Sequence, residues 1–298
     1  MRFGLILLLC LLNTGCALWR KDREEPVENG PRQQKAEPVL KPSEVLKPKS
    51  LEIASPISDL FYMRGTYFQG AVDTVIRVDS SGATTPDGTV VSGEDDLGLD
   101  DVVDMARMEF DVRMGERNHL LIDYFKLDRF GDVVLPRDMN FGDFSFQAGD
   151  NFRSKIDWHM LGLTYTYSLF RSERFEAGVG LGLHIIEAKA EGNEPGTLNI
   201  VKDSEAGPFP TIAVNGAYRI SKRWSVTARG QTFTANRDES QGTLSDYHAD
   251  VQYRWKKNFA IGIGYSSIHV DLDVADPDQS FLFQMDASGP ELFFRAAF

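Results

Sequence analysis

The feature that most constrains the fold is a strict alternation of side-chain character over residues 105–114, Met-Ala-Arg-Met-Glu-Phe-Asp-Val-Arg-Met. From position 106 onward every even residue is apolar, and every odd residue from 107 to 113 is charged. An extended strand with this pattern has one apolar face and one charged face. Similar segments recur down to the last residue, Phe298. A barrel in lipid needs this arrangement, with apolar faces outward and polar faces inward, so the pattern predicts a transmembrane β-barrel.

Composition narrows the class further. The chain has 298 residues and a net charge of -12. After the first 20 residues no apolar run is long enough for a spanning helix, which excludes a helical membrane protein. Binding to nucleic acid requires a basic stripe or patch, and none is present, so nucleic acid is not expected as a partner.

Residues 1–17 have the pattern of a signal peptide, with Arg2 followed by an apolar run. Both cysteines, Cys10 and Cys16, lie within it, so the exported body has no disulfide framework. The pair Gly15-Cys16 resembles the cleavage site of bacterial lipoproteins and predicts lipidation at Cys16, although Asn13 replaces the usual Leu. Cleavage after Ala17 is the alternative.

Residues 18–55 read as a linker. Five of the chain's 13 prolines lie between positions 20 and 50, and the tetrapeptide Val-Leu-Lys-Pro occurs at 39 and again at 45. A segment of this composition buries little apolar surface, so we expect a disordered periplasmic tether that is partly polyproline II.

Residues 56–298 alternate between strand-like segments and two kinds of connection. The short turns lie at 115–118, 171–174, 221–223 and 256–258, and the longer connections near 80–102, 132–153, 188–207, 235–243 and 273–288. Four short and five long connections predict about ten strands, within a range of eight to twelve. The predicted fold is therefore all-β, an antiparallel up-and-down barrel in the outer membrane. An even number of strands places both termini on the periplasmic side.

Charged residues at inward positions predict the state of the lumen. A Lys or Arg facing lipid at mid-membrane costs about 2 to 4 kcal/mol, so the charged faces must point inward. Both signs are present in a narrow barrel, and paired charges are expected to occlude it. The predicted lumenal network consists of Arg107, Glu109, Asp111, Arg113, Arg229, Asp250, Arg254 and Arg295.

Several segments resemble a family of Gram-negative outer-membrane β-barrel proteins that carries no established activity. The matching segments are Glu-Asp-Asp-Leu-Gly-Leu-Asp at 94–100, Asn-Phe-Gly-Asp at 140–143, Gly-Val-Gly-Leu-Gly-Leu-His at 178–184, Gly-Ile-Gly-Tyr at 262–265 and the C-terminal segment 289–298. The last is similar to the signal read by the barrel-assembly machinery. The resemblance places that signal at Leu292, Phe294 and Phe298, and it implies outer-membrane lipid and lipopolysaccharide as surroundings.

Asp246 and His248 are the candidates for catalysis. Their spacing points both side chains into the lumen, where a carboxylate can orient an imidazole, and we expect them near the outer end of a strand. Omptin proteases are similar in using an Asp with a His two residues on, and they also need an acidic pair across the cleft. Here Glu94, Asp95 or Asp96 would have to supply it. The alternative is an ordinary salt-bridged barrel interior.

Glu94, Asp95 and Asp96 are also weak candidates for a Ca²⁺ or Mg²⁺ site in the first outer loop. An acidic, solvated loop is the simpler interpretation, and no cofactor motif is present.

The sequence therefore predicts a barrel with a structural or surface-interaction role and an occluded lumen. A narrow passive channel for small solutes and an omptin-like rim hydrolase are the two alternatives.

Overall fold

The computed structural model describes residues 56–82, 85–193, 200–237, 240–276 and 279–298. The predicted signal peptide, the predicted lipidation site Cys16 and the predicted linker at 18–55 lie outside these residues. In the part of the chain that is described, no helix is long and apolar enough to cross a membrane.

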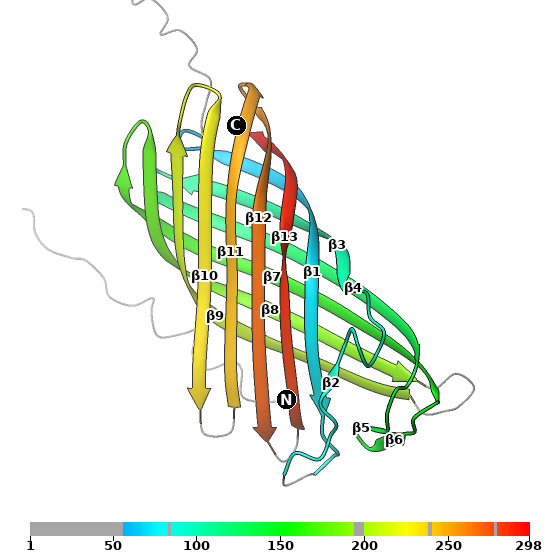
Figure 1. Ribbon diagram of the computed structural model, residues 1–298. Coiled ribbons are helices and arrows are strands. Elements are labelled where there is room, and N and C mark those ends of the chain that lie inside the picture. The colour runs from blue at the N-terminus through cyan, green and yellow to red at the C-terminus, as the bar shows by residue number, and fades with distance from the viewer. Residues whose placement is uncertain (1–55, 83–84, 194–199, 238–239, 277–278) are drawn as a thin grey trace, which may run out of the picture. The chain divides into compact units, whose positions relative to one another are not determined.

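Ten long strands form one antiparallel sheet (Figure 1). They are β1 (Phe61–Val78), β3 (Val102–Met114), β4 (Asn118–Val134), β7 (Asn151–Arg171), β8 (Phe175–Asn193), β9 (Ile200–Arg219), β10 (Trp224–Arg237), β11 (Ser240–Lys256), β12 (Phe259–Asp276) and β13 (Gln279–Ala297). Each pairs with its neighbour along the chain, and β13 pairs with β1 to close the barrel. The short strand β2 (Val91–Ser92) pairs with β1, and β5 (Met139–Phe141) pairs with β6 (Phe144–Phe146). The fold is a ten-stranded transmembrane β-barrel, as predicted.

The two ends of the barrel differ. The turn end carries the four short connections, the start of β1 and the end of β13, and the loop end carries the longer connections. At the turn end the C-terminal residue completes the closure. The amide of Phe298 donates to the carbonyl of Phe61 at 2.9 Å, and the amide of Leu60 donates to the carbonyl of Phe298 at 2.8 Å.

An apolar belt surrounds the half of the barrel nearer the turn end. Large apolar side chains there point outward, including Leu163 and Leu183 on adjacent strands, and Ile263, which is 67% exposed. Their lumen-facing neighbours along the strands are polar residues or glycines, such as Thr164 and His184. This is the arrangement that lipid requires, because the outer wall then presents no unpaired charge to hydrocarbon.

Beyond the belt, toward the loop end, the two faces of β7, β12 and β13 exchange character. In β7 the outward residues change from charged to apolar, and the inward residues change from apolar to polar. The outward series is Arg153, Lys155, Asp157, Leu161, Leu163 and Tyr165, and the inward series is Phe152, Ile156, Trp158, Thr164, Thr166 and Ser168. The loop half is thus built like a soluble barrel, with its apolar side chains inside.

This exchange overturns three predicted loops. The segments 188–207, 235–243 and 273–288 were expected to be long connections, but β8 to β13 continue through most of them. Among the side chains described there, Lys189 and Asp286 lie exposed on the outward face of extended strands. The segments near 80–102 and 132–153 do contain loops, together with the short strands β2, β5 and β6.

Candidate functional site

The lumen of the membrane-embedded half is crossed by ion pairs, beginning at the turn end. Asp59, just before β1, accepts hydrogen bonds from Arg254 at 2.5 and 2.9 Å and from Arg295 at 3.0 Å. Asp59 is 5% exposed, and both arginines are similarly buried. One carboxylate therefore ties β11 and β13 to the segment that enters the barrel.

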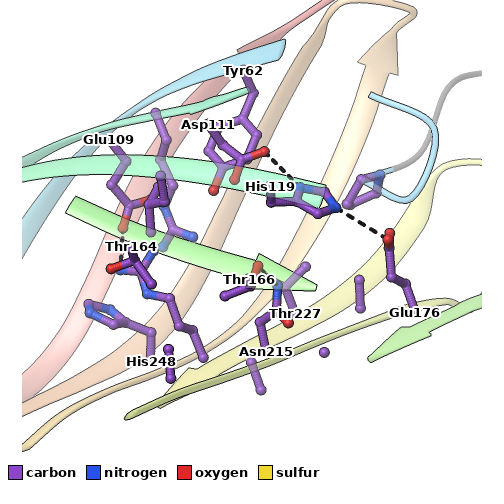
Figure 2. Close-up of a pocket in the computed structure, with 18 of the residues that line it drawn as sticks. Tyr62, Glu109, Asp111, His119, Thr164, Thr166, Glu176, Asn215, Thr227 and His248 are labelled. Atoms are coloured by element: carbon purple, nitrogen blue, oxygen red, sulfur yellow. Dashed lines mark hydrogen bonds and ion pairs between the residues drawn. The ribbon is translucent and has the colours of Figure 1, made fainter. Parts of the chain in front are cut away.

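One layer further in, Arg113 of β3 and Glu176 of β8 form a two-pronged ion pair, with both nitrogen–oxygen distances at 2.9 Å. His119 of β4 lies beside them, and its ring nitrogens are 3.0 Å from Asp111 and 3.2 Å from Glu176 (Figure 2). Carboxylates only accept hydrogen bonds, so a doubly protonated ring satisfies both contacts.

The middle layer joins opposite walls. Arg64 of β1 donates to Asp250 of β11 at 2.7 Å and also binds Glu291 of β13. Arg229 of β10 donates to Glu109 of β3 at 2.6 Å, a contact that spans the lumen. All these side chains are buried or nearly so.

The deepest layer holds the candidate catalytic pair. His248 Nε2 lies 2.9 Å from Asp246 Oδ1, and His248 Nδ1 lies 2.7 Å from Ser266 Oγ. Arg107 binds the other oxygen of Asp246 at 2.8 Å and also contacts His248. A Ser-His-Asp order is therefore present, but the hydroxyl of Ser266 donates to Glu291. All of these groups are buried.

Asp246 and His248 were predicted to lie near the outer end of their strand, and this prediction is wrong. β11 begins at Ser240, so the pair lies in mid-strand, and Leu244 on the loop side of it is 1% exposed. Nor do Glu94, Asp95 or Asp96 face the pair across a cleft. Glu94 instead binds Arg129 at 2.6 Å.

An apolar core fills the lumen on the loop side of this layer. Trp158 of β7 is fully buried and stacks on Phe283 of β13, with ring centroids 5.4 Å apart. Phe125, Leu127 and Met285 belong to the same core. Charged and apolar fillings therefore follow one another along the axis of the barrel.

A cavity of about 100 Å³ lies within the charged layers, and Figure 2 shows its lining. Five buried side-chain atoms of its lining residues have no hydrogen-bond partner among the described residues: Glu109 Oε2, Asn215 Oδ1, Arg229 Nε, Asp250 Oδ1 and Arg295 Nε. Both donors and acceptors are represented. A polar cavity of this size has room for several water molecules.

Comparison with known proteins finds similar barrels. No family model matches the chain, and no curated protein matches its sequence. Solved structures do match. The outer membrane protease OmpT from Escherichia coli is 8% identical with a TM-score of 0.48, and the match covers 80% of this chain and 97% of that one. The translocator domain of the autotransporter NalP from Neisseria meningitidis is 10% identical with a TM-score of 0.40, over 80% and 88%. The transport unit of the autotransporter AIDA-I from Escherichia coli is 11% identical with a TM-score of 0.39, over 85% and 92%.

Two of the three acidic loop residues that were considered for a metal site, Glu94 and Asp96, bind arginines. Besides the Glu94–Arg129 pair, Asp96 accepts from Arg137 at 2.6 and 3.2 Å. The amide of Asp95 donates to the hydroxyl of Ser92. Among the residues described here, no group of three or more His, Cys, Asp or Glu side chains is placed to hold a metal ion.

The predicted network lacked several of its members, among them Asp59, Ser266 and Glu291. Ser266 and Glu291 are inward by the same alternation as Gly262 and Arg295, so a stricter assignment of strand faces would have found them. Asp59 precedes the first strand and has no periodic signal.

Proposed function

We propose that the protein is an outer-membrane β-barrel with a structural or surface-interaction role and a lumen closed to dissolved solutes. The observation that supports this best is that two different sets of side chains fill the lumen, one after the other along its axis. Ion pairs cross the half inside the apolar belt, and the Trp158 core fills the half beyond it. Any recognition of other molecules then falls to the outer wall and the loop end.

A narrow channel needs a continuous wet path past Arg107, Glu109 and Arg229. These side chains bind carboxylates or arginines across the lumen and are buried, with Arg229 the most exposed of them. The cavity of about 100 Å³ lies among the ion pairs, and the apolar core follows it in series.

A rim hydrolase has the Ser266–His248–Asp246 order in its favour. A substrate would have to reach these groups past the apolar core, and a nucleophilic hydroxyl would have to give up its bond to Glu291. The same contacts serve a salt-bridged interior, which is the role we assign to them.

The remaining sequence predictions fit this proposal. Both termini of the barrel lie at the turn end, which we place in the periplasm, with the tether and a lipidated Cys16 on that side. Leu292, Phe294 and Phe298 would serve as the signal for the assembly machinery. Outer-membrane lipid and lipopolysaccharide would surround the apolar belt.

Single-channel conductance of the refolded barrel in a planar bilayer tests the closed lumen. We expect no steps from the parent protein. The Arg107→Ala/Arg229→Ala double variant should also be silent, because the apolar core stands in series with the ion pairs. Arg153→Ala, on the exposed outer wall, is the control for unspecific leakage.

Steady, reproducible steps from the parent protein would make the passive channel the better proposal. Steps from the double variant alone would show that the ion pairs, without the core, keep the barrel closed.

A further inference from the structure

The barrel wall has a seam between β9 and β10. These strands pair only from Ser225↔Arg219 to Thr232↔Ile212, although β9 continues to Ile200 and β10 to Arg237. Among the described residues no pairing joins the two strands beyond that point. Figure 1 shows β9 turning away from β10 toward the loop end. β8 and β11, on the far sides, stay paired with β9 and β10 along their length.

Two prolines account for the seam. Pro208 and Pro210 lie on β9 immediately beyond the last pair with β10. The ladder between β8 and β9 runs past both without a shift, so the positions that lack an N–H face β10. A proline cannot donate to a ladder and is confined to strand edges. Pro290 of β13 also coincides with a gap in a ladder. The β1–β13 pairing stops at Phe68↔Glu291 and resumes at Ala71↔Ser288.

The outer side of the seam lies in the apolar belt. Pro208 and Pro210 are exposed on the outward face, as is Ile212 at 63%. Their partners on β8 are Ile185 and Leu183, which point outward in the belt. The gap in the ladder therefore begins where the wall faces hydrocarbon.

The inner side of the seam is closed by two aromatic rings. Phe209 of β9 and Phe233 of β10 meet edge to face, with centroids 6.0 Å apart. Both are partly buried and pack against the apolar core of the lumen. Side-chain contact without backbone hydrogen bonds holds this part of the wall together, which makes it easier to open than its paired neighbours.

Apolar side chains lead inward from these rings. A Cβ on Gly242 would lie 3.5 Å from Leu272 Cδ2 and 3.9 Å from Phe209 Cε1, so both side chains cover the same glycine. Leu272 and Phe283 line a mainly apolar cavity of about 40 Å³, to whose lining Arg77 and Lys189 also belong. Phe283 in turn stacks on Trp158. A path lined mainly by apolar side chains thus runs from the lipid-facing wall to the core.

We propose that the seam is a lateral portal through which one hydrocarbon chain of a membrane phospholipid enters the loop half of the lumen. The chain parts Phe209 from Phe233 and ends against Phe283. A phospholipid is the occupant because the portal opens into the belt, where lipid chains are the neighbours, and because Phe209, Phe233 and Leu272, the described side chains that lead inward from it, are apolar. This role goes beyond the proposed function, since a portal for a lipid chain leaves the lumen closed to ions.

Fluorescence quenching of Trp158 tests the portal. Replacing Trp19, Trp224 and Trp255 by Phe leaves Trp158 as the single tryptophan. The outward neighbours of Trp158 are Asp157 and His159, so it lies beyond the belt and inside the wall. In vesicles of phosphatidylcholine with a nitroxide near the end of one acyl chain, the quencher reaches Trp158 only through the wall. We expect quenching.

Restoring the missing donors should close the portal. Pro208→Thr/Pro210→Thr lets β9 continue its ladder with β10, and quenching should be lost. Pro290→Thr is the matched control, because it changes an outward proline away from the seam, and quenching should persist. Phe233→Ala, which removes one of the sealing rings and no backbone donor, should increase quenching. Heat-modifiable gel mobility shows which variants are folded.

Absence of quenching in the parent overturns the proposal, as does equal quenching in folded Pro208→Thr/Pro210→Thr. If the double variant does not fold, unchanged quenching in Phe233→Ala overturns it. Quenching by a free nitroxide-labelled fatty acid but not by the phospholipid overturns the phospholipid as occupant. None of these results depends on conductance, so the portal and the closed lumen fail separately.

Discussion

At the scale of single residues, the charged part of the lumen is stabilised by arginines that form ion pairs with carboxylates of other strands. Arg113 and Glu176 are the clearest case, because the pair is two-pronged and buried and also engages His119 and Ser168. Such a pair contributes little compared with an apolar substitute, but the loss of one partner leaves the other buried and uncompensated.

Glu176→Gln should therefore destabilise the barrel strongly. The amide keeps the size of the side chain but leaves Arg113 without its counter-charge, at a cost of about 3 to 5 kcal/mol. The free energy of unfolding in urea, measured in lipid vesicles, checks this. Glu173→Gln, on the exposed turn, should change it little. Equal stability of the two variants would contradict the assignment of Glu176 to a buried pair.

Asp96, in the loop between β1 and β3, gives a prediction for pH. The hydrogen bond from Arg137 lowers the pKa of Asp96 below its ordinary value, against a smaller opposing effect of burial. A carboxylate with a lowered folded-state pKa stabilises the loop above the ordinary range of Asp and loses that contribution as pH falls through the folded pKa. The amide of Ser92 donates to the same carboxylate at 2.9 Å and reports on it.

The amide resonance of Ser92, followed by NMR during acidification, should shift with a midpoint below about 3.9, the ordinary pKa of Asp. Arg137→Ala should raise that midpoint, and Asp96→Asn should abolish the transition. A midpoint that does not move in Arg137→Ala would show that the arginine does not hold the carboxylate.

At the scale of strands, the glycines of β8 set how closely β7 and β8 approach. A Cβ on Gly180 would collide with the backbone carbonyl oxygen of Tyr165, which cannot move away cheaply. Gly216 on β9 is different, because the nearest atom to its added Cβ is the carbonyl oxygen of Glu176 at 3.8 Å.

Gly180→Ala should accordingly destabilise the barrel by about 1 to 3 kcal/mol, the usual cost of overpacking. Gly216→Ala should be close to neutral. Urea midpoints of the two variants at equal protein and lipid concentration make the comparison. A lower urea midpoint for Gly216→Ala than for Gly180→Ala would contradict the close approach of β7 and β8 at Gly180.

How much of a strand could be predicted depended on its surroundings. In the belt, alternation gave the correct faces for Glu109 and Phe110, because lipid forces apolar residues outward. Beyond the belt the alternation persists but its meaning reverses, so Phe283 was assigned to a loop although it is core. The two halves of a strand differ only in whether water or lipid lies outside the barrel wall. The periodicity of the sequence does not show which of the two it is. The contacts of Asp59 and the seam at Pro210 depend on residues far apart in the chain and could not be predicted.

At the scale of the whole molecule, one barrel combines two interiors. The half inside the belt is a membrane protein with a charged lumen, and the half beyond it is a soluble barrel with an apolar core. Because the same ten strands run through both, neither half can shift its register without misplacing the faces of the other. We propose that the two fillings together leave no aqueous path across the membrane.

A cysteine-accessibility measurement along β7 tests this account most directly. In a Cys10→Ser/Cys16→Ser background no other cysteine is present. Lys155→Cys, Ile156→Cys and Leu163→Cys are each exposed to a charged, water-soluble maleimide after reconstitution. We expect rapid labelling at 155 on the wet outer wall, no labelling at 156 in the dry core and none at 163 against lipid. Labelling at 156 as rapid as at 155 would contradict it, because water would then fill the lumen where we place the apolar core.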